Sequence, residues 1–160
     1  MDFGDTVKVL RAIPMFAKLD PSKLKLVAFA SAHLTFDDGE ALFFEGDPSD
    51  GVYLIDEGTV NICVDSNGSE ITVGSLTNRE LFGEMAIFRN EPRSATIRAS
   101  GSVKVLRIDG DMFLRVVTEY PETALEVMRI LSEKIAKSMV SERTLQDRVQ
   151  DLENQLGGGI

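Results

Sequence analysis

Apolar residues in the first 36 positions recur at intervals of three and four, the spacing of one face of a helix. These positions include Val7, Leu10, Phe16, Leu24, Leu26, Val27 and Phe29. Asp20 and Pro21 form a helix-start signal, because an Asp side chain accepts backbone N–H groups and Pro fits the first turn. Pro14 interrupts the preceding helical stretch. The pattern therefore predicts that residues 1 to about 36 are helical, in short pieces.

Between residues 39 and 110 the pattern changes to short runs of β-forming residues separated by turn residues. Nine of the chain's 13 glycines lie here, and they separate runs such as 52–55, 60–64 and 103–108. Asn67 and Gly68 tolerate the positive φ of a tight hairpin, so a turn is expected at 65–68. Many short strands at close spacing favour a β-sandwich or a barrel-like roll.

From Asp111 the helical spacing returns, first over about 111–118 and then from Pro121 to about Leu156. The long segment carries a heptad pattern in which eight of ten seam positions are apolar. Its a positions are Met128, Ile135, Glu142, Val149 and Leu156, and its d positions are Ala124, Leu131, Ser138, Leu145 and Leu152. The first half has a wider apolar face that would pack on the roll. The second half has the narrow stripe of a coiled coil, which predicts a homodimer.

Composition restricts the classes of function. The 160 residues suit one domain, and the net charge of −9 disfavours binding to DNA or to an anionic membrane. We find no signal peptide and no apolar run of membrane-spanning length. The single cysteine, Cys63, favours the cytoplasm, and with the single histidine, His33, it provides neither a zinc site nor a catalytic triad. We therefore expect no metal site, no catalytic residues and no enzyme activity.

The segment 82–96 (FGEMAIFRNEPRSAT) combines groups that suit a sugar phosphate. Gly83 opens one turn of helix, whose exposed N–H groups attract an anion. Arg93, nine residues after Glu84, provides a planar fork for phosphate oxygens. Glu84 would repel a phosphate, so its expected role is to accept a hydrogen bond from a hydroxyl such as that of a ribose. Together these residues predict a nucleotide phosphate–ribose site.

This segment resembles the phosphate-binding cassette of cyclic nucleotide-binding domains, whose pattern is F-G-E-x-A, a short spacer and R-x-A. The spacing from Glu84 to Arg93 is similar to that of the regulatory subunits of cAMP-dependent protein kinase, and residues 41–60 are similar to the family's early β-roll. The resemblance implies an α+β fold: an eight-stranded antiparallel β-roll (double-stranded β-helix, jelly-roll-like) with N-terminal helices and a long C-terminal helix. The expected units are 1–120, the helix 121–156 and a flexible tail 157–160.

The family resemblance also implies roles for individual residues. Glu84 would bind the ribose 2′-hydroxyl and Arg93 the cyclic phosphate, with backbone N–H groups nearby completing the cradle. Ser94 stands where a hydroxyl helps to bind guanine in some relatives, although bacterial cAMP receptors also carry Ser here. The stretch 141–144 corresponds to the base-covering part of the last helix. The predicted ligand-binding set is Phe82, Gly83, Glu84, Met85, Ala86, Arg93, Ser94, Ala95 and Arg143.

The expected function is that of a non-enzymatic sensor for cAMP or cGMP, with cAMP favoured, that signals by repositioning its last helix. Only four residues follow Leu156, so we expect a stand-alone form without a DNA-binding domain. Its partners would be the cyclic nucleotide, a second copy of the chain through the C-terminal helix, and an unidentified downstream protein. The alternative is a ligand-free scaffold that uses the coiled-coil helix.

Overall fold

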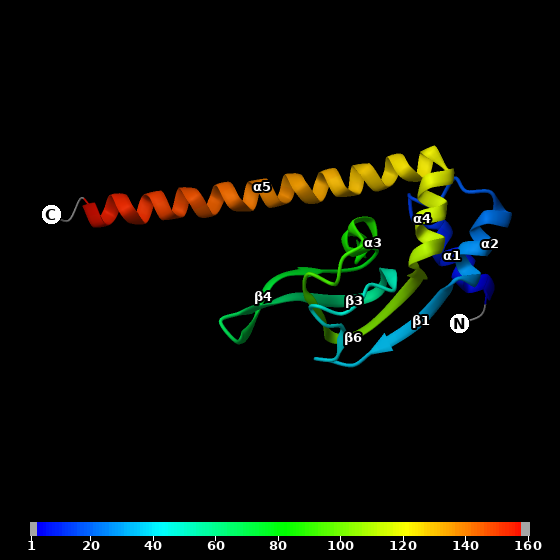
Figure 1. Ribbon diagram of the computed structural model, residues 1–160, viewed down its shortest axis with the longest axis horizontal. Coiled ribbons are helices and arrows are strands. Elements are labelled where there is room, and N and C mark those ends of the chain that lie inside the picture. Colours follow the sequence, from blue (N-terminus) through cyan, green and yellow to red (C-terminus); the bar gives the residue numbers. More distant parts are fainter. Residues whose placement is uncertain (1–2, 158–160) are drawn as a thin grey trace.

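The computed structural model describes residues 3–157 and contains five helices and six strands in that range (Figure 1). In chain order these are α1 (Phe3–Arg11), α2 (Pro21–Phe29), β1 (Ser31–Phe36), β2 (Ala41–Phe43), β3 (Gly51–Ser66), β4 (Ser69–Leu76), β5 (Leu81–Phe82), α3 (Glu84–Arg89), β6 (Thr96–Asp109), α4 (Gly110–Glu119) and α5 (Pro121–Gly157). The N-terminal helices and α4 lie together at one end of the sheet (Figure 1).

All strand pairings are antiparallel, in the order β1-β6-β3-β4, with β2 also on β6 and β5 on β3. The α+β class is confirmed, but the predicted count of eight strands is not, because residues 3–157 form six. β3 joins the two runs predicted at 52–55 and 60–64 into one 16-residue strand. The register between β3 and β6 shifts on both sides of Glu57, where Gly58 has φ 106°. An irregularity thus bends one long strand where the sequence pattern indicates two.

The prediction that helical structure continues to about residue 36 was wrong. α2 ends at Phe29, and residues 31–36 form β1, which pairs with β6 from Ser31↔Ile108 to Phe36↔Val103. Pairing with β6 satisfies the backbone groups of this segment and brings Leu34 and Phe36 against the core. The predicted hairpin is confirmed, because Asn67 and Gly68 have φ 53° and 84° between β3 and β4.

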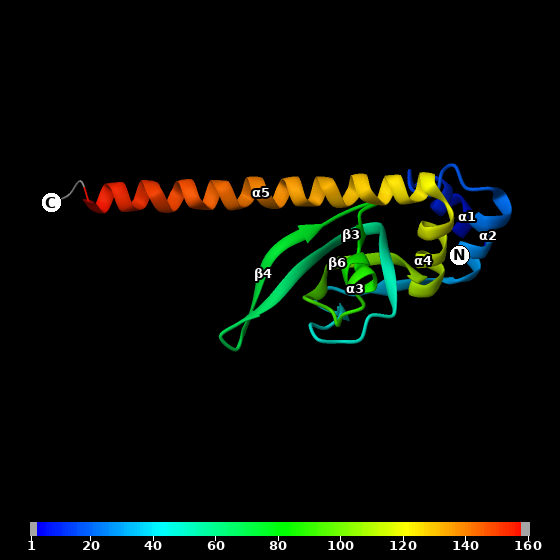
Figure 2. The same ribbon diagram turned by 45° about the horizontal axis from the view of Figure 1, so that its top comes forward.

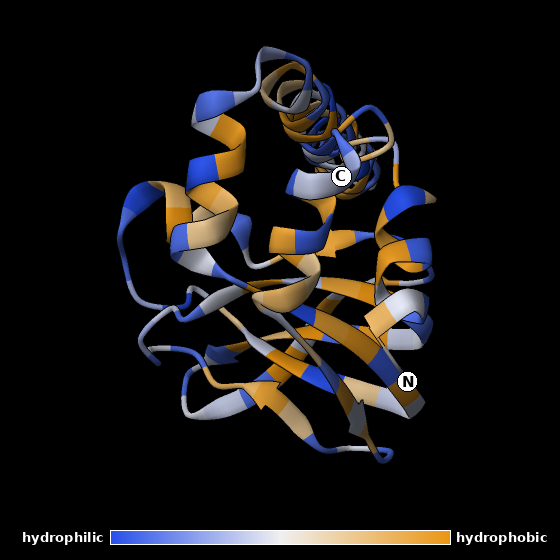
Figure 3. Ribbon diagram, turned by 90° about the vertical axis from the view of Figure 1, so that its right-hand side faces the viewer, coloured by the Kyte–Doolittle hydropathy of each residue, from blue (hydrophilic) through white to orange (hydrophobic). Residues whose placement is uncertain are grey.

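Two groups of buried residues form the core. One joins the helices to the sheet and includes Leu10, Phe16, Leu54 and Phe113. The other lies within the folded sheet around Tyr53 and Phe82. In the end-on view of Figure 3, hydrophobic segments follow the strands, whereas α5 carries both hydrophobic and hydrophilic residues.

The long helix α5 passes over the sheet and then projects beyond it (Figures 1 and 2). Thr123 and Val127 are its buried residues, and both lie near its start. Beyond Ser141 its apolar side chains are exposed: Leu145 by 61%, Val149 by 54%, Leu152 by 59% and Leu156 by 78%. Gly157, assigned to the tail from the sequence, is the last residue of α5, and residues 158–160 lie outside the described residues. Within residues 3–157, every helix is too short or too polar to cross a bilayer.

Candidate functional site

Gly83 sets the geometry of the site at the start of α3. Its φ of 84° lies in the left-handed region that side chains rarely adopt. A Cβ at this position would lie 2.7 Å from Nη1 of Arg93 and 3.5 Å from the carbonyl oxygen of Gly51. Only glycine therefore allows the backbone to turn into α3 and Arg93 to lie directly against it.

Arg93 is 3% exposed and is held by the protein on several sides. Its Nη1 donates to the carbonyl of Gly83 at 2.9 Å, and its Nη2 donates to the carbonyl of Gly51 at 2.7 Å. Nη2 also pairs with Asp50 at 3.2 Å, and the guanidinium lies 4.1 Å from the centre of the Phe43 ring. The buried Nε has no hydrogen-bond partner within residues 3–157. Because a buried donor without an acceptor is unfavourable, this group is suited to a bound anion.

Glu84 is the other buried charge of the site, with an exposed fraction of 1%. Its Oε1 accepts a hydrogen bond from Nζ of Lys134 on α5 at 2.6 Å, and the same Nζ donates to the carbonyl of Leu81 at 2.8 Å. Within the described residues, Lys134 is the only side chain of α5 that makes a hydrogen bond or an ion pair outside that helix. One ion pair therefore joins the long helix to the cassette.

A cavity of about 630 Å³ lies between the cassette, the sheet and α5. Eight of the nine predicted site residues line it: Phe82, Gly83, Glu84, Met85, Ala86, Arg93, Ser94 and Ala95. The ninth, Arg143, lies exposed on α5 outside this lining, so its contact with a ligand stays a prediction. Apolar side chains from the strands form a further wall: Phe43, Ile62, Val73, Leu76 and Ile97.

The sequence reasoning missed most of the α5 residues that face this cavity. They are Lys134, Lys137, Ser138 and Ser141, of which Ser141 lies in the stretch 141–144 expected to cover a base. Lys134, Ser138 and Ser141 follow the i, i+4, i+7 spacing of one helix face. Ser138 also interrupts the heptad seam, and this polar stripe was the signal that could have identified the face.

The aromatic residues next to Arg93 contribute no charge at neutral pH. Tyr53 stacks on Phe82 with ring centres 5.2 Å apart, and Phe43 lies 5.4 Å from Tyr53. Burial and the nearby carboxylate of Asp50 raise the pKa of the Tyr53 phenol above its ordinary value of 10.0. Beside the apolar wall, the site thus holds the ion pairs Arg93–Asp50 and Glu84–Lys134. This arrangement can accept one anion and one hydroxyl group.

The single histidine and the single cysteine of the chain are not among the residues that line this cavity. Nε2 of His33 lies 2.6 Å from the hydroxyl of Thr6, so this histidine links β1 to α1. Cys63 is 3% exposed in β3. Within residues 3–157, no three His, Cys, Asp or Glu side chains gather closely enough to hold a metal ion.

Three known proteins are similar to this chain over two thirds or more of its length. The type II regulatory subunit of cAMP-dependent protein kinase from Drosophila melanogaster is 32% identical over 111 residues, 69% of this chain and 29% of that protein. The regulatory domain of Toxoplasma gondii PKA, crystallised with cAMP, is 26% identical with a TM-score of 0.63 over 72% of this chain and 46% of that chain. The sensor domain of the transcriptional regulator DNR from Pseudomonas aeruginosa shares the fold, with 23% identity and a TM-score of 0.73 over 86% and 93% of the two chains.

The chain thus spans less than a third of the length of the Drosophila regulatory subunit. The sequence model of the cyclic nucleotide-binding domain matches residues 33–120, which are 88 of the 160 residues. This match includes the Gly83 turn, Glu84 and Arg93. The chain therefore belongs to the cyclic nucleotide-binding domain family.

Proposed function

We propose that this protein is a non-enzymatic cyclic nucleotide sensor, with cAMP as the favoured ligand. The observation that carries this proposal is that two buried charged residues near the Gly83 turn, Glu84 and Arg93, line one cavity together with a polar face of α5. The regulatory subunit from Drosophila melanogaster belongs to a cAMP-dependent kinase and the Toxoplasma gondii regulatory domain was crystallised with cAMP, which supports cAMP over cGMP.

The ligand would use the two charged residues for different groups. The cyclic phosphate would face Arg93 and the N–H groups at the start of α3, whose glycine allows close approach. A ribose hydroxyl would donate to the carboxylate of Glu84, where Oε1 already pairs with Lys134. The base would lie between the apolar strand wall and the hydroxyls of Ser138 and Ser141.

The signal would pass through Lys134. A ribose hydroxyl that shares Glu84 with Lys134 changes the strength of the one polar link between α5 and the cassette. A ligand shifts a conformational equilibrium only by differential affinity for the two states. We therefore propose that nucleotide binding selects between two positions of α5.

The projecting half of α5 would carry this change to a partner. Its exposed Leu145, Val149, Leu152 and Leu156 continue the heptad seam, and Arg148 and Glu153 stand at the g and e positions that pair between parallel helices. We propose a parallel homodimer through this segment, with a downstream protein reading the dimer geometry. The same stripe would serve the alternative function, a ligand-free scaffold.

Calorimetric titration of nucleotide-free protein with cAMP, and separately with cGMP, tests the proposal. We expect saturable one-site binding that is abolished in Arg93→Glu and retained in the matched control Arg115→Glu, on the exposed surface of α4. Because Arg93 is buried, circular dichroism must show that the variant folds, and Arg93→Lys provides a milder replacement. If neither nucleotide gives heat or raises the melting temperature, the scaffold function replaces the sensor.

A further inference from the structure

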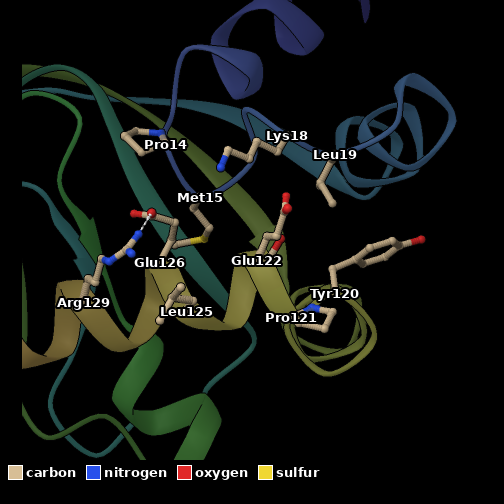
Figure 4. Close-up of a pocket in the computed structure, with 11 residues that line it drawn as sticks. Pro14, Met15, Lys18, Leu19, Tyr120, Pro121, Glu122, Leu125, Glu126 and Arg129 are labelled. Atoms are coloured by element: carbon tan, nitrogen blue, oxygen red, sulfur yellow. Dashed lines mark hydrogen bonds and ion pairs between the residues drawn. The ribbon is translucent and has the colours of Figure 1, made fainter.

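A second cavity, of about 570 Å³, lies between the Pro14–Leu19 segment and the corner where α4 meets α5 (Figure 4). It shares no lining residue with the cavity between the cassette, the sheet and α5, which is the proposed nucleotide site. Its apolar lining includes Met15 and Leu19, which are buried, and Leu125, which is 47% exposed. These side chains offer a surface for an apolar group of moderate size.

Two opposite charges line this cavity, and neither has a partner among the residues that the structure describes. Lys18 comes from the Pro14–Leu19 segment and Glu122 from the start of α5, and both line the cavity (Figure 4). Neither makes an ion pair or a side-chain hydrogen bond within residues 3–157, whereas the neighbouring Glu126 and Arg129 pair with each other. The two unpaired charges match a ligand that carries both signs.

The first turn of α5 supplies further donors. Thr123 is 2% exposed and lines the cavity, and its hydroxyl has no hydrogen-bond partner among the described residues. Tyr120 precedes the helix without a capping side chain, and Pro121 has no N–H group. The amides of Glu122 and Thr123 therefore also lack a capping acceptor in residues 3–157. Free amides at a helix start, beside the hydroxyl of a largely buried threonine that lines the cavity, favour a carboxylate.

We propose that this cavity binds a small zwitterion with an apolar side chain, such as the amino acids leucine and methionine. The carboxylate would be bound by the α5 amides, the Thr123 hydroxyl and Lys18. The ammonium group would pair with Glu122, and the side chain would lie against Met15 and Leu125. This proposal does not depend on nucleotide binding, because the two cavities have no residue in common.

Calorimetry and thermal shift with L-leucine and L-methionine on the full chain test the site. We expect a dissociation constant of about 1 mM or tighter for at least one of them. Two leucine analogues isolate the charges: 4-methylpentanoate lacks the amine, and 3-methylbutylamine lacks the carboxylate. Each should bind about fivefold to tenfold more weakly than leucine.

Variants then locate the site. Lys18→Met, Glu122→Gln and Thr123→Val should each weaken leucine binding about fivefold or more, while Lys25→Met, an exposed residue of α2 outside the cavity, should leave it unchanged. The first two replace exposed residues and leave the core intact. Absence of saturable binding, analogues that bind as tightly as leucine, or cavity variants that behave as Lys25→Met does, would each overturn the proposal.

Discussion

Replacement of Lys134 by Met measures the link between α5 and the cassette. The change removes the ammonium from a 2.6 Å ion pair with Glu84, whose side chain is 2% exposed, and leaves that carboxylate without its partner. Loss of one partner of a fully buried pair costs about 3–5 kcal/mol. The Lys134 side chain is 35% exposed, so solvent screens part of the interaction, and we expect a loss of about 2 kcal/mol.

Urea unfolding of nucleotide-free protein, followed by circular dichroism, gives this value as a midpoint shift of roughly 1 M. The matched control is Lys137→Met, three residues along the same helix and exposed, with no ion pair within residues 3–157. We expect the control to change stability by less than about 0.5 kcal/mol. In Glu84→Gln the uncompensated charge is gone, so adding Lys134→Met should cost at least about 1 kcal/mol less than it does alone. Equal losses for Lys134→Met and Lys137→Met would refute the reasoning.

Three further expectations test other parts of the structure. Gly83→Ala should lose roughly 1–2 kcal/mol of stability from its positive φ, and it should weaken nucleotide binding because the new Cβ displaces Nη1 of Arg93; calorimetry and urea unfolding measure both effects. The phenol of Tyr53 should ionise above pH 10.0 in the folded protein. Its contribution to stability is therefore complete below that pH and is lost as the pH rises through the folded pKa. Absorbance at alkaline pH follows this ionisation, and Tyr53→Phe, compared with wild type, should lack it. If the proposed dimer forms, Leu145→Asp combined with Leu152→Asp should convert it to a monomer in analytical ultracentrifugation, whereas Thr144→Asp, off the seam, should not.

Local patterns predicted those parts of the structure that depend on nearby residues. The hairpin at Asn67 and Gly68 and the helix that starts at Pro121 follow from positive φ and from helix-start chemistry, so they formed as expected. The segment 31–36 did not, because its pairing with β6, 67 to 77 residues further along the chain, decides its structure. The bend at Gly58 likewise depends on register with β6.

The site shows the same division between local and distant information. The spacing from Glu84 to Arg93 identified the cassette, because both residues lie on one short segment around α3. Their partners could not be read from that segment. Asp50 lies 43 residues before Arg93, and Lys134 lies 50 residues after Glu84, so only the folded chain brings these charges together.

The two buried charges of the cassette are therefore anchored to different parts of the protein. Arg93 is fixed by carbonyls and a carboxylate at the ends of strands and turns, and by the Phe43 ring, all within the body around the sheet. Glu84 is fixed by α5, which has the fewest buried residues for its length among the helices of residues 3–157. In the proposed binding mode, the ligand would therefore act on a rigid partner at its phosphate and on a weakly packed helix at its ribose. Because Lys134 lies beyond the buried start of α5, it could move with less disruption of the core than the partners of Arg93. On the proposed mechanism, the hydroxyl–Glu84 contact, rather than the phosphate contact, would therefore report binding to the rest of the chain.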